Sequence, residues 1–234
     1  MYLDITELRE FYGSPLGRTA QLLIRARLLE AWPSLDGGLT VGLGYAGPLL
    51  RGLDAGNAPP LLMMPAEQGV GRWPRGRPNR AALVDDTGLP LPDACVDRLV
   101  VCHALEHADD SRRLVRELWR VLAPEGRLLV VVPHRGSPWS FSDRTPFGQG
   151  RPYSVRQISR LLGDGMLEPL GWLGALHAPP AEGRLGIRLL RWAEAPGARL
   201  WPGFAGVLLV EARKVVEARI GGRRARPALA YARA

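Results

Sequence analysis

Two nearly continuous apolar runs lie close together in the middle of the chain, at Val96–Cys102 and Arg127–Val132. Neither run alternates with polar residues, which is typical of strands buried on both faces of a parallel sheet. Between them, Asp110–Leu122 repeats apolar residues at helical spacing and carries its arginines mostly on the opposite face. Pro124–Gly126 ends that helix and turns the chain. The pattern predicts a strand–helix–strand unit, and therefore an open parallel sheet.

The same patterns predict the remaining elements. Further strands are predicted at Leu39–Leu43, Pro60–Pro65, Ala81–Val84, Met166–Leu176 and Phe204–Lys214. Further helices are predicted at Thr6–Tyr12, Leu16–Trp32, Ser154–Leu162 and Arg184–Ala195, with a turn at Pro196–Pro202. Ser14 and Pro15 have the residue types of an N-cap and a first helical position for the second helix.

Composition bounds the class of protein. The 234 residues, 46% of them hydrophobic, are enough for one sizeable core. No apolar run approaches the roughly 18–20 residues that span a bilayer, and the first ten residues lack the order of a signal peptide. We therefore expect a cytoplasmic protein without a membrane partner. Cys95 and Cys102 lie in or beside one predicted strand and are expected to be reduced.

The formal net charge is +8, and Lys214 is the single lysine among 31 basic residues. Such a charge is compatible with a nucleic-acid partner. However, the arginines are scattered and are not interleaved with aromatic residues, which favours solvated surfaces. We interpret residues 217–234, rich in arginine, glycine and alanine, as a flexible basic tail.

A glycine-rich turn, Gly42–Pro48, follows the first predicted strand. Glycine lets the backbone approach a ligand closely because it has no Cβ and tolerates positive φ. A helix starting near Pro48 would add free amides at its N-terminus. This pattern suits several nucleotide-like cofactors and does not distinguish among them.

Four short motifs follow one another between residues 85 and 126: Asp85–Asp93, Val96-Asp97, Leu105-Glu106-His107 and Glu117–Gly126. In this order and spacing they resemble the small class I S-adenosylmethionine-dependent methyltransferases of the type-11 family. The resemblance covers about residues 36–178. It implies an α/β fold, a Rossmann-like three-layer sandwich whose seven-stranded, mostly parallel sheet has an antiparallel last strand and helices on both faces.

The resemblance also implies a domain organisation and a cofactor. We expect an N-terminal helical cap at residues 1–35, a methyltransferase-like domain at 36–216 and a lid loop at 134–153. The implied donor is S-adenosylmethionine, with S-adenosylhomocysteine as product. The residues that the resemblance assigns to the cofactor are Gly42, Gly44 and Ala46 in the glycine loop and Asp85 and Asp86 after the third strand. His103 follows the fourth strand, where an open α/β sheet places ligands, and we expect it to line the cofactor or substrate pocket.

Two positions depart from the family pattern. Thr40 stands where an acidic residue usually precedes the glycine loop, and the second strand ends in Met64-Pro65, without the usual acceptor for the ribose hydroxyls. Losing that acceptor removes about 1.5–3 kcal/mol of charge-assisted hydrogen bonding. The candidates to replace it are Glu67, Gln68 and backbone groups.

Residues 134–153 form a long polar and aromatic segment after the fifth strand. Because it starts at the carboxyl end of a strand, it can cover a pocket there. We predict a substrate lid with Trp139, Tyr153 and Arg144 as contact residues. An ordinary loop with a packed aromatic cluster is the alternative.

His103–His107 also fits the H-x-x-E-H pattern of some metalloproteases, which needs both histidines on one helical face. Here the segment follows a strand directly and precedes the next helix cap, so we predict a turn and no metal.

The sequence thus predicts methyl transfer to an unidentified small or medium-sized acceptor. His103, His134 and Tyr153 are candidates for a general base, and the pattern singles out none of them. The alternative is a methyltransferase-like binding or scaffold module without catalysis. A nucleic-acid amino methyltransferase is disfavoured, because Cys102–Leu105 replaces the Asn/Asp-Pro-Pro-aromatic signature expected after the fourth strand.

Overall fold

The computed structural model describes residues 2–35, 38–53 and 59–215, so the predicted tail at 217–234 lies outside the described residues. Seven strands form one sheet in the order β3-β2-β1-β4-β5-β7-β6. Their bounds are β1 Thr40–Gly44, β2 Leu61–Pro65, β3 Ala81–Val84, β4 Val96–Cys102, β5 Leu122–Pro133, β6 Leu167–Ala175 and β7 Val207–Lys214. β1 to β5 pair in parallel, and β7 runs antiparallel to both β5 and β6. This confirms the predicted mostly parallel sheet with an antiparallel last strand.

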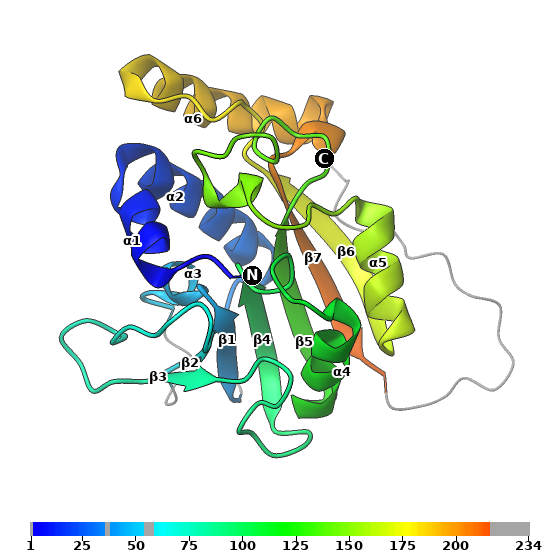
Figure 1. The fold of residues 1–234 in the computed structure, drawn as a ribbon. Helices are drawn as coiled ribbons and strands as arrows, with labels where there is room; N and C mark the ends of the chain where they lie inside the picture. The colour runs from blue at the N-terminus through cyan, green and yellow to red at the C-terminus, as the bar shows by residue number, and fades with distance from the viewer. Residues whose placement is uncertain (1, 36–37, 54–58, 216–234) are drawn as a thin grey trace, which may run out of the picture.

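Helices cover both faces of the sheet (Figure 1). On one face lie α1 (Ile5–Gly13), α2 (Pro15–Ala31) and α6 (Gly183–Leu200), and on the other α4 (Ser111–Val121) and α5 (Val155–Asp164). Side chains along the central strands alternate between the two cores: Val100 and Cys102 pack on the α2 side, Leu99 and Val101 on the α4 side. Leu99–Cys102 of β4 and Leu128–Val132 of β5 are buried on both faces, so these stretches contain no charged residue, as the continuous apolar runs indicated.

The connections around β2 are unusual for a parallel sheet, whose crossovers are usually helical. The helix after β1, α3, has only one turn, Gly47–Leu50, and residues 66–80 connect β2 to β3 without any helix. The α2 side of β2 is therefore covered in part by the loop around Trp73, a partly buried residue that packs against the buried core on this side.

Most predicted boundaries agree with the structure to within one or two residues. The helix caps predicted from the sequence are also present. The Ser14 side chain accepts a hydrogen bond from the backbone amide of Gly17, with Pro15 at the first helical position. Ser154 and Gln157 form a complete capping box at the start of α5.

Two expectations were wrong. β5 starts at Leu122 instead of Arg127, because Leu122 already pairs with Val96 before the chain turns at Glu125. The predicted turn at Pro196–Pro202 is instead largely helix, since α6 continues through Pro196 to Leu200. Proline removes one helical hydrogen bond, but Gly197 just after it packs tightly on His177 and holds the last turn in place.

Gly44 offers a test of the fold. Its φ is +75°, and a Cβ placed there would lie 2.3 Å from the carbonyl oxygen of Cys102. We expect Gly44→Ala to lower the free energy of unfolding by about 2–4 kcal/mol, from backbone strain and the displaced strand end. The matched control is Gly163→Ala on α5, where a Cβ meets nothing within 4 Å; better helix propensity there raises stability by about 0.5–1 kcal/mol. Denaturant unfolding monitored by circular dichroism measures both, and equal effects would contradict this account.

Candidate functional site

The sheet has its topological switch point between β1 and β4, where ligands bind in open α/β sheets, beyond the carboxyl ends of the strands. The chain leaves β1 through Gly44, and the backbone amide of Tyr45 then donates to the carbonyl oxygen of Cys102 at 2.8 Å. Gly44 and His103 are thereby held side by side at the ends of these two strands. Gly42 and Ala46 are buried beneath the turn.

An acidic recess of about 420 Å³ lies beyond the ends of β2 and β3. We use this name for the recess lined by Glu67, Asp85, Asp86, Asp109 and Asp110, with Tyr2 and Arg113 also in its wall. It brings together Asp85 and Asp86, as predicted from the motif. It also contains Glu67, the candidate replacement for the missing carboxylate after β2.

Hydrogen bonds fix the two central carboxylates of this recess. Asp85 accepts from the backbone amide of Thr87 at 2.8 Å and from its hydroxyl at 2.7 Å, and these bonds hold the pKa of Asp85 below its usual range. Asp86 accepts a short hydrogen bond from the Tyr2 hydroxyl. Burial and this bond raise the pKa of Tyr2, so its hydroxyl remains a donor.

A second, buried cluster lies behind the switch point. The Tyr12 hydroxyl is 2.8 Å from Nε2 of His103, whose Nδ1 lies 3.3 Å from the Glu106 carboxylate. The side-chain amide of Gln68 donates to the His103 carbonyl oxygen at 2.8 Å. Tyr12, His103 and Glu106 therefore form a continuous chain of polar contacts between α1 and the end of β4.

The charge state of this chain follows from its surroundings. Burial disfavours the imidazolium of His103, but its neighbours Cys102 and Glu106 outweigh burial, and the pKa of His103 rises to about 10. Burial likewise opposes ionisation of Glu106, yet His103 and His107 hold its pKa below the usual value. With this pKa, His103 is protonated at neutral pH, its Nε2 can donate to the Tyr12 hydroxyl, and it is not available as a base.

Ligand atoms of His103, Glu106 and His107 lie within 4.8 Å of one another. The segment is a turn, as predicted, and not the helix that the metalloprotease pattern requires. His103 Nδ1 lies 3.3 Å from the Glu106 carboxylate, so these two groups form an ion pair when His103 is protonated.

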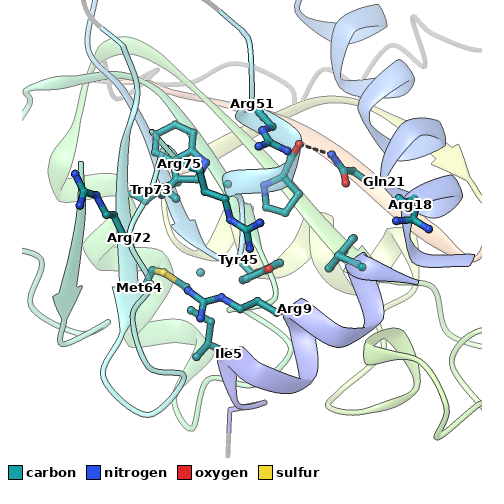
Figure 2. A pocket seen from close by; sticks show the side chains of 17 residues that line it. Ile5, Arg9, Arg18, Gln21, Tyr45, Arg51, Met64, Arg72, Trp73 and Arg75 are labelled. Atoms are coloured by element: carbon teal, nitrogen blue, oxygen red, sulfur yellow. Dashed lines mark hydrogen bonds between the residues drawn. The ribbon is translucent and has the colours of Figure 1, made fainter. Parts of the chain in front are cut away.

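Figure 2 shows a third group of side chains, around a recess of about 350 Å³ on the α2 side of β2. We call it the arginine recess. Its basic residues are Arg9 on α1, Arg18 on α2, Arg51 after α3, and Arg72 and Arg75 in the loop before β3. Tyr45, Trp73 and Met64 supply apolar and aromatic surface, and Gly44 reaches it from the glycine turn.

Strand β2 separates the two recesses. Met64 lines the arginine recess, and the next residue, Pro65, lines the acidic one. The N-terminal segment runs past both, since Tyr2 lines the acidic recess and Ile5 the arginine recess. The backbone amide of Ile5 donates to the carbonyl oxygen of buried Gln68 at 2.8 Å, which ties this segment to the end of β2.

The predicted lid residues lie apart from these recesses. Trp139 is fully buried, and its indole donates to the Ala178 carbonyl oxygen at 2.7 Å. Tyr153 is buried in the core on the α4 side, whereas Arg144 is exposed. The loop itself folds onto the end of β4, where the amide of Arg151 donates to the Glu106 carbonyl oxygen at 2.8 Å. In this conformation Trp139 and Tyr153 pack the loop, and a role in substrate contact stays a prediction.

Sequence reasoning did not identify the arginine recess or the hydrogen bonds of Tyr2 and Tyr12. The five arginines come from four separate segments, so their spacing gave no signal. The loop around Trp73, rich in glycine, proline and arginine, was the one local indication.

Comparison with known proteins agrees with the motifs. A model of the methyltransferase domain matches residues 72–130, which include Asp85, Asp86 and all of β4. A probable S-adenosylmethionine-dependent methyltransferase of Mycobacterium tuberculosis is 36% identical over 110 residues, covering 46% of this chain and 39% of that protein. A ubiquinone/menaquinone biosynthesis C-methyltransferase of Acidiphilium cryptum is 37% identical over 90 residues, covering 35% of this chain and 36% of that one. These matches thus span well under two thirds of the length of the relatives.

Solved structures support the fold over most of the chain. A Thermotoga maritima S-adenosylmethionine-dependent methyltransferase, described as a possible histamine N-methyltransferase, covers 90% of this chain and 96% of its own, with a TM-score of 0.62 and 18% identity. Geranyl diphosphate C-methyltransferase of Streptomyces coelicolor, solved with S-adenosylhomocysteine, gives a TM-score of 0.56 at 16% identity, over 82% of this chain and 77% of its own. The chain has the fold of these structures, and residues 72–130 match the methyltransferase domain in sequence, which supports the resemblance.

Two histidines with opposite pKa shifts give a direct test of the site. Burial lowers the pKa of His134, whose Nδ1 donates to the Ala205 carbonyl oxygen. An unfolded histidine titrates near pH 6.5. We therefore expect one histidine resonance to titrate below about pH 6.5 and one near pH 10 in a proton NMR titration.

The sign of the stability effect follows. Because the folded pKa of His103 is raised, its protonation stabilises the fold below about pH 6.5, and this contribution is lost as pH rises toward 10. Glu106→Gln should lower the high pKa by about one unit or more, and His134→Gln should remove the low-pKa resonance alone. If no histidine remains protonated above about pH 8, the ion pair with Glu106 is wrong.

Proposed function

We propose that this protein is an enzyme that transfers a methyl group from S-adenosylmethionine to a small-molecule acceptor. The observation that carries the proposal is the acidic recess, which brings Glu67, Asp85 and Asp86 together at the ends of two parallel strands. Asp85 and Asp86 lie inside the region that matches the methyltransferase domain, and Glu67 lies just before it. The sequence matches supply the reaction type. The acceptor is the part that the relatives do not define, since their names differ.

The acidic recess suits the cofactor in charge and in hydrogen bonding. S-adenosylmethionine has a net positive charge from its sulfonium and ammonium groups, which carboxylates attract. Asp85, ionised and held by Thr87, would accept from the adenine amino group. Glu67 is exposed in the same recess and would accept from the ribose hydroxyls, in place of the residue missing after β2.

The cofactor supplies an electrophilic methyl carbon on a positively charged sulfur. The chain then has to align the acceptor with that carbon and exclude competing water, which is mainly a matter of positioning. A base is needed only where the accepting atom carries a proton. His134 is a better candidate than His103, because it is neutral and its Nδ1–H donates to Ala205, which leaves Nε2 as a proton acceptor.

The non-catalytic alternative rested on the missing ribose carboxylate and the altered glycine turn. The presence of Glu67 beside Asp85 and Asp86 weakens the first reason. The second reason stands, because Gly44 keeps the conformation that the turn requires but lines the arginine recess and not the acidic one.

Calorimetric titration with S-adenosylhomocysteine tests this proposal. We expect Asp85→Ala to weaken binding roughly ten- to a hundredfold, the effect of one lost charge-assisted hydrogen bond. Thr87→Ala is the matched control, because it removes one donor to Asp85 and keeps the carboxylate, so binding should change by less than about threefold. A substitution of Gly44, such as Gly44→Val, would not test cofactor binding cleanly, because a side chain at this position displaces the ends of β1 and β4.

An activity measurement with tritiated methyl donor and candidate acceptors follows if binding is found. Folded wild-type protein that gives no heat up to millimolar S-adenosylhomocysteine would show that the recess does not hold the cofactor, and the enzyme proposal would fail.

A further inference from the structure

Large apolar side chains are exposed along α6 and just after it. Leu185 is 84% exposed and Trp192 72%, and a further group is half exposed or more: Leu189, Leu200, Trp201 and Phe204. We call these residues together the α6 patch. Leu185, Leu189 and Trp192 are spaced four and three positions apart, so they form one row along the helix. Exposed apolar surface of this kind indicates a contact with something outside the protein.

A row of arginines runs beside this apolar row. Arg184, Arg188 and Arg191 have the same spacing, shifted by one position, and all are exposed, as is Arg199 in the last turn. Within the described part of the chain, no ion pair involves an arginine of α6. The single carboxylate of the helix, Glu194, is buried on its inner side. The outer side of α6 is thus basic along one row and apolar along the next.

The inner side of α6 fixes the helix on the protein. Leu190, Glu194 and Gly197 are buried there, and the helix contacts α2 and β6. The Glu194 carboxylate accepts from the backbone amides of Leu176 and His177, at 3.0 and 3.1 Å. Figure 1 shows α6 along the outer margin of the molecule. Because the helix is held from within, its two outer rows are available for an external contact.

The α6 patch also reaches the edge of the sheet that carries the candidate site. Trp201 and Phe204 line a recess of about 380 Å³ together with Pro138 of the predicted lid. Just after Phe204, the Gly206 carbonyl oxygen accepts from the backbone amide of His134, which follows the carboxyl end of β5. A surface in contact with the end of the patch would therefore lie beside this edge.

The charges of α6 indicate what kind of partner fits. A second copy of this chain is disfavoured, because a two-fold contact through α6 would bring two basic rows together. Residues 216–234 contain five arginines and one glutamate, so the same repulsion disfavours this segment of the chain. A nucleic acid offers phosphates but no aliphatic surface for Leu185 and Leu189. Anionic lipids offer both, since their headgroups are negative and their acyl chains are apolar.

We propose that the outer side of α6 docks the protein on the surface of a bilayer that contains anionic lipids. Leu185, Leu189 and Trp192 enter the boundary between headgroups and acyl chains, and Arg184 and Arg188 contact the lipid phosphates. In the described residues, no helix is long and apolar enough to span a membrane. The expectation of no membrane partner was based on spanning segments, whereas this contact is with the surface. The docking does not depend on the proposed methyl transfer.

Sedimentation of the full chain with lipid vesicles tests the docking. We expect the protein to pellet with vesicles of phosphatidylcholine and phosphatidylglycerol in a ratio of about 7 to 3, and to bind phosphatidylcholine alone at least about tenfold more weakly. Leu185→Gln/Trp192→Gln should weaken binding to the anionic vesicles at least about tenfold, because it removes apolar surface that the bilayer buries. The matched control, Leu83→Gln/Met166→Gln, changes exposed apolar residues elsewhere and should leave binding within about twofold.

The arginine row has a test of its own. Arg184→Gln/Arg188→Gln should weaken binding to the anionic vesicles at least about fivefold at low ionic strength, and by less at high ionic strength. The matched control is Arg116→Gln/Arg160→Gln, which removes the same charge from exposed positions on α4 and α5 and should change binding by less than about twofold. Circular dichroism and thermal melting establish that all variants are folded.

Quenching by brominated phosphatidylcholine locates the contact. Bromine on the acyl chains quenches only tryptophans that lie near them, and Trp192 and Trp201 are the exposed tryptophans of the described residues. At saturating anionic vesicles, we expect the fluorescence of wild-type protein to be quenched. Trp192→Phe/Trp201→Phe, which keeps aromatic side chains at both positions, should lose most of that quenching and still pellet.

The proposal is overturned if folded wild-type protein does not pellet with the anionic vesicles. It is also overturned if the α6 variants bind as wild-type protein does, or if the tryptophan variant keeps its quenching, since the contact would then lie elsewhere. A wild-type dimer that Leu185→Gln/Trp192→Gln converts to monomers, without vesicle binding, would assign the α6 patch to a second copy. An oligonucleotide that binds wild-type protein and not the Arg184→Gln/Arg188→Gln variant, again without vesicle binding, would indicate a nucleic-acid surface.

Discussion

The contact between the end of β1 and the end of β4 constrains everything at the candidate site. Gly44 bends the chain with a φ of +75° so closely over Cys102 that no Cβ fits, and Tyr45 completes the contact through its amide. This one turn aims the Tyr45 ring into the arginine recess and leaves His103 buried behind it. With any other residue at position 44, the strand ends would have to separate, and both the recess and the buried cluster would change shape.

Acidic and basic side chains gather on different sides of β2, whose successive side chains face opposite sides of the sheet. The carboxylates collect beyond β2 and β3 on one side, and the guanidinium groups collect on the other, where crossover helices are short or absent. The scattered arginines of the sequence are therefore not only solvated residues. A subset of them converges because α1, α2 and the loop before β3 meet over the same strand.

Much of the fold could be predicted because it depends on local rules. Continuous apolar runs mark strands buried on both faces, Ser14-Pro15 and Ser154 mark helix starts, and the motif spacing fixes the strand order through the resemblance. The end of α6 was predicted too early because Pro196 favours the end of a helix. In the structure the packing of Gly197 on His177 outweighs this local preference, and the helix continues to Leu200. Asp85 and Asp86 were predictable because one motif contains both. Arg9 and Arg75 were not, because 65 intervening residues separate them and only the tertiary fold brings them together.

The alternation along β2 also bears on how sequences with this fold can diverge. Substituting Met64 or Pro65 alters one recess and leaves the other intact, so the two recesses can change separately over evolutionary time. Inserting or deleting a single residue within β2 is a different event, because it turns every later side chain of the strand to the opposite face. Natural variation here should consist of replacements at constant strand length, with length changes confined to the connection at residues 66–80.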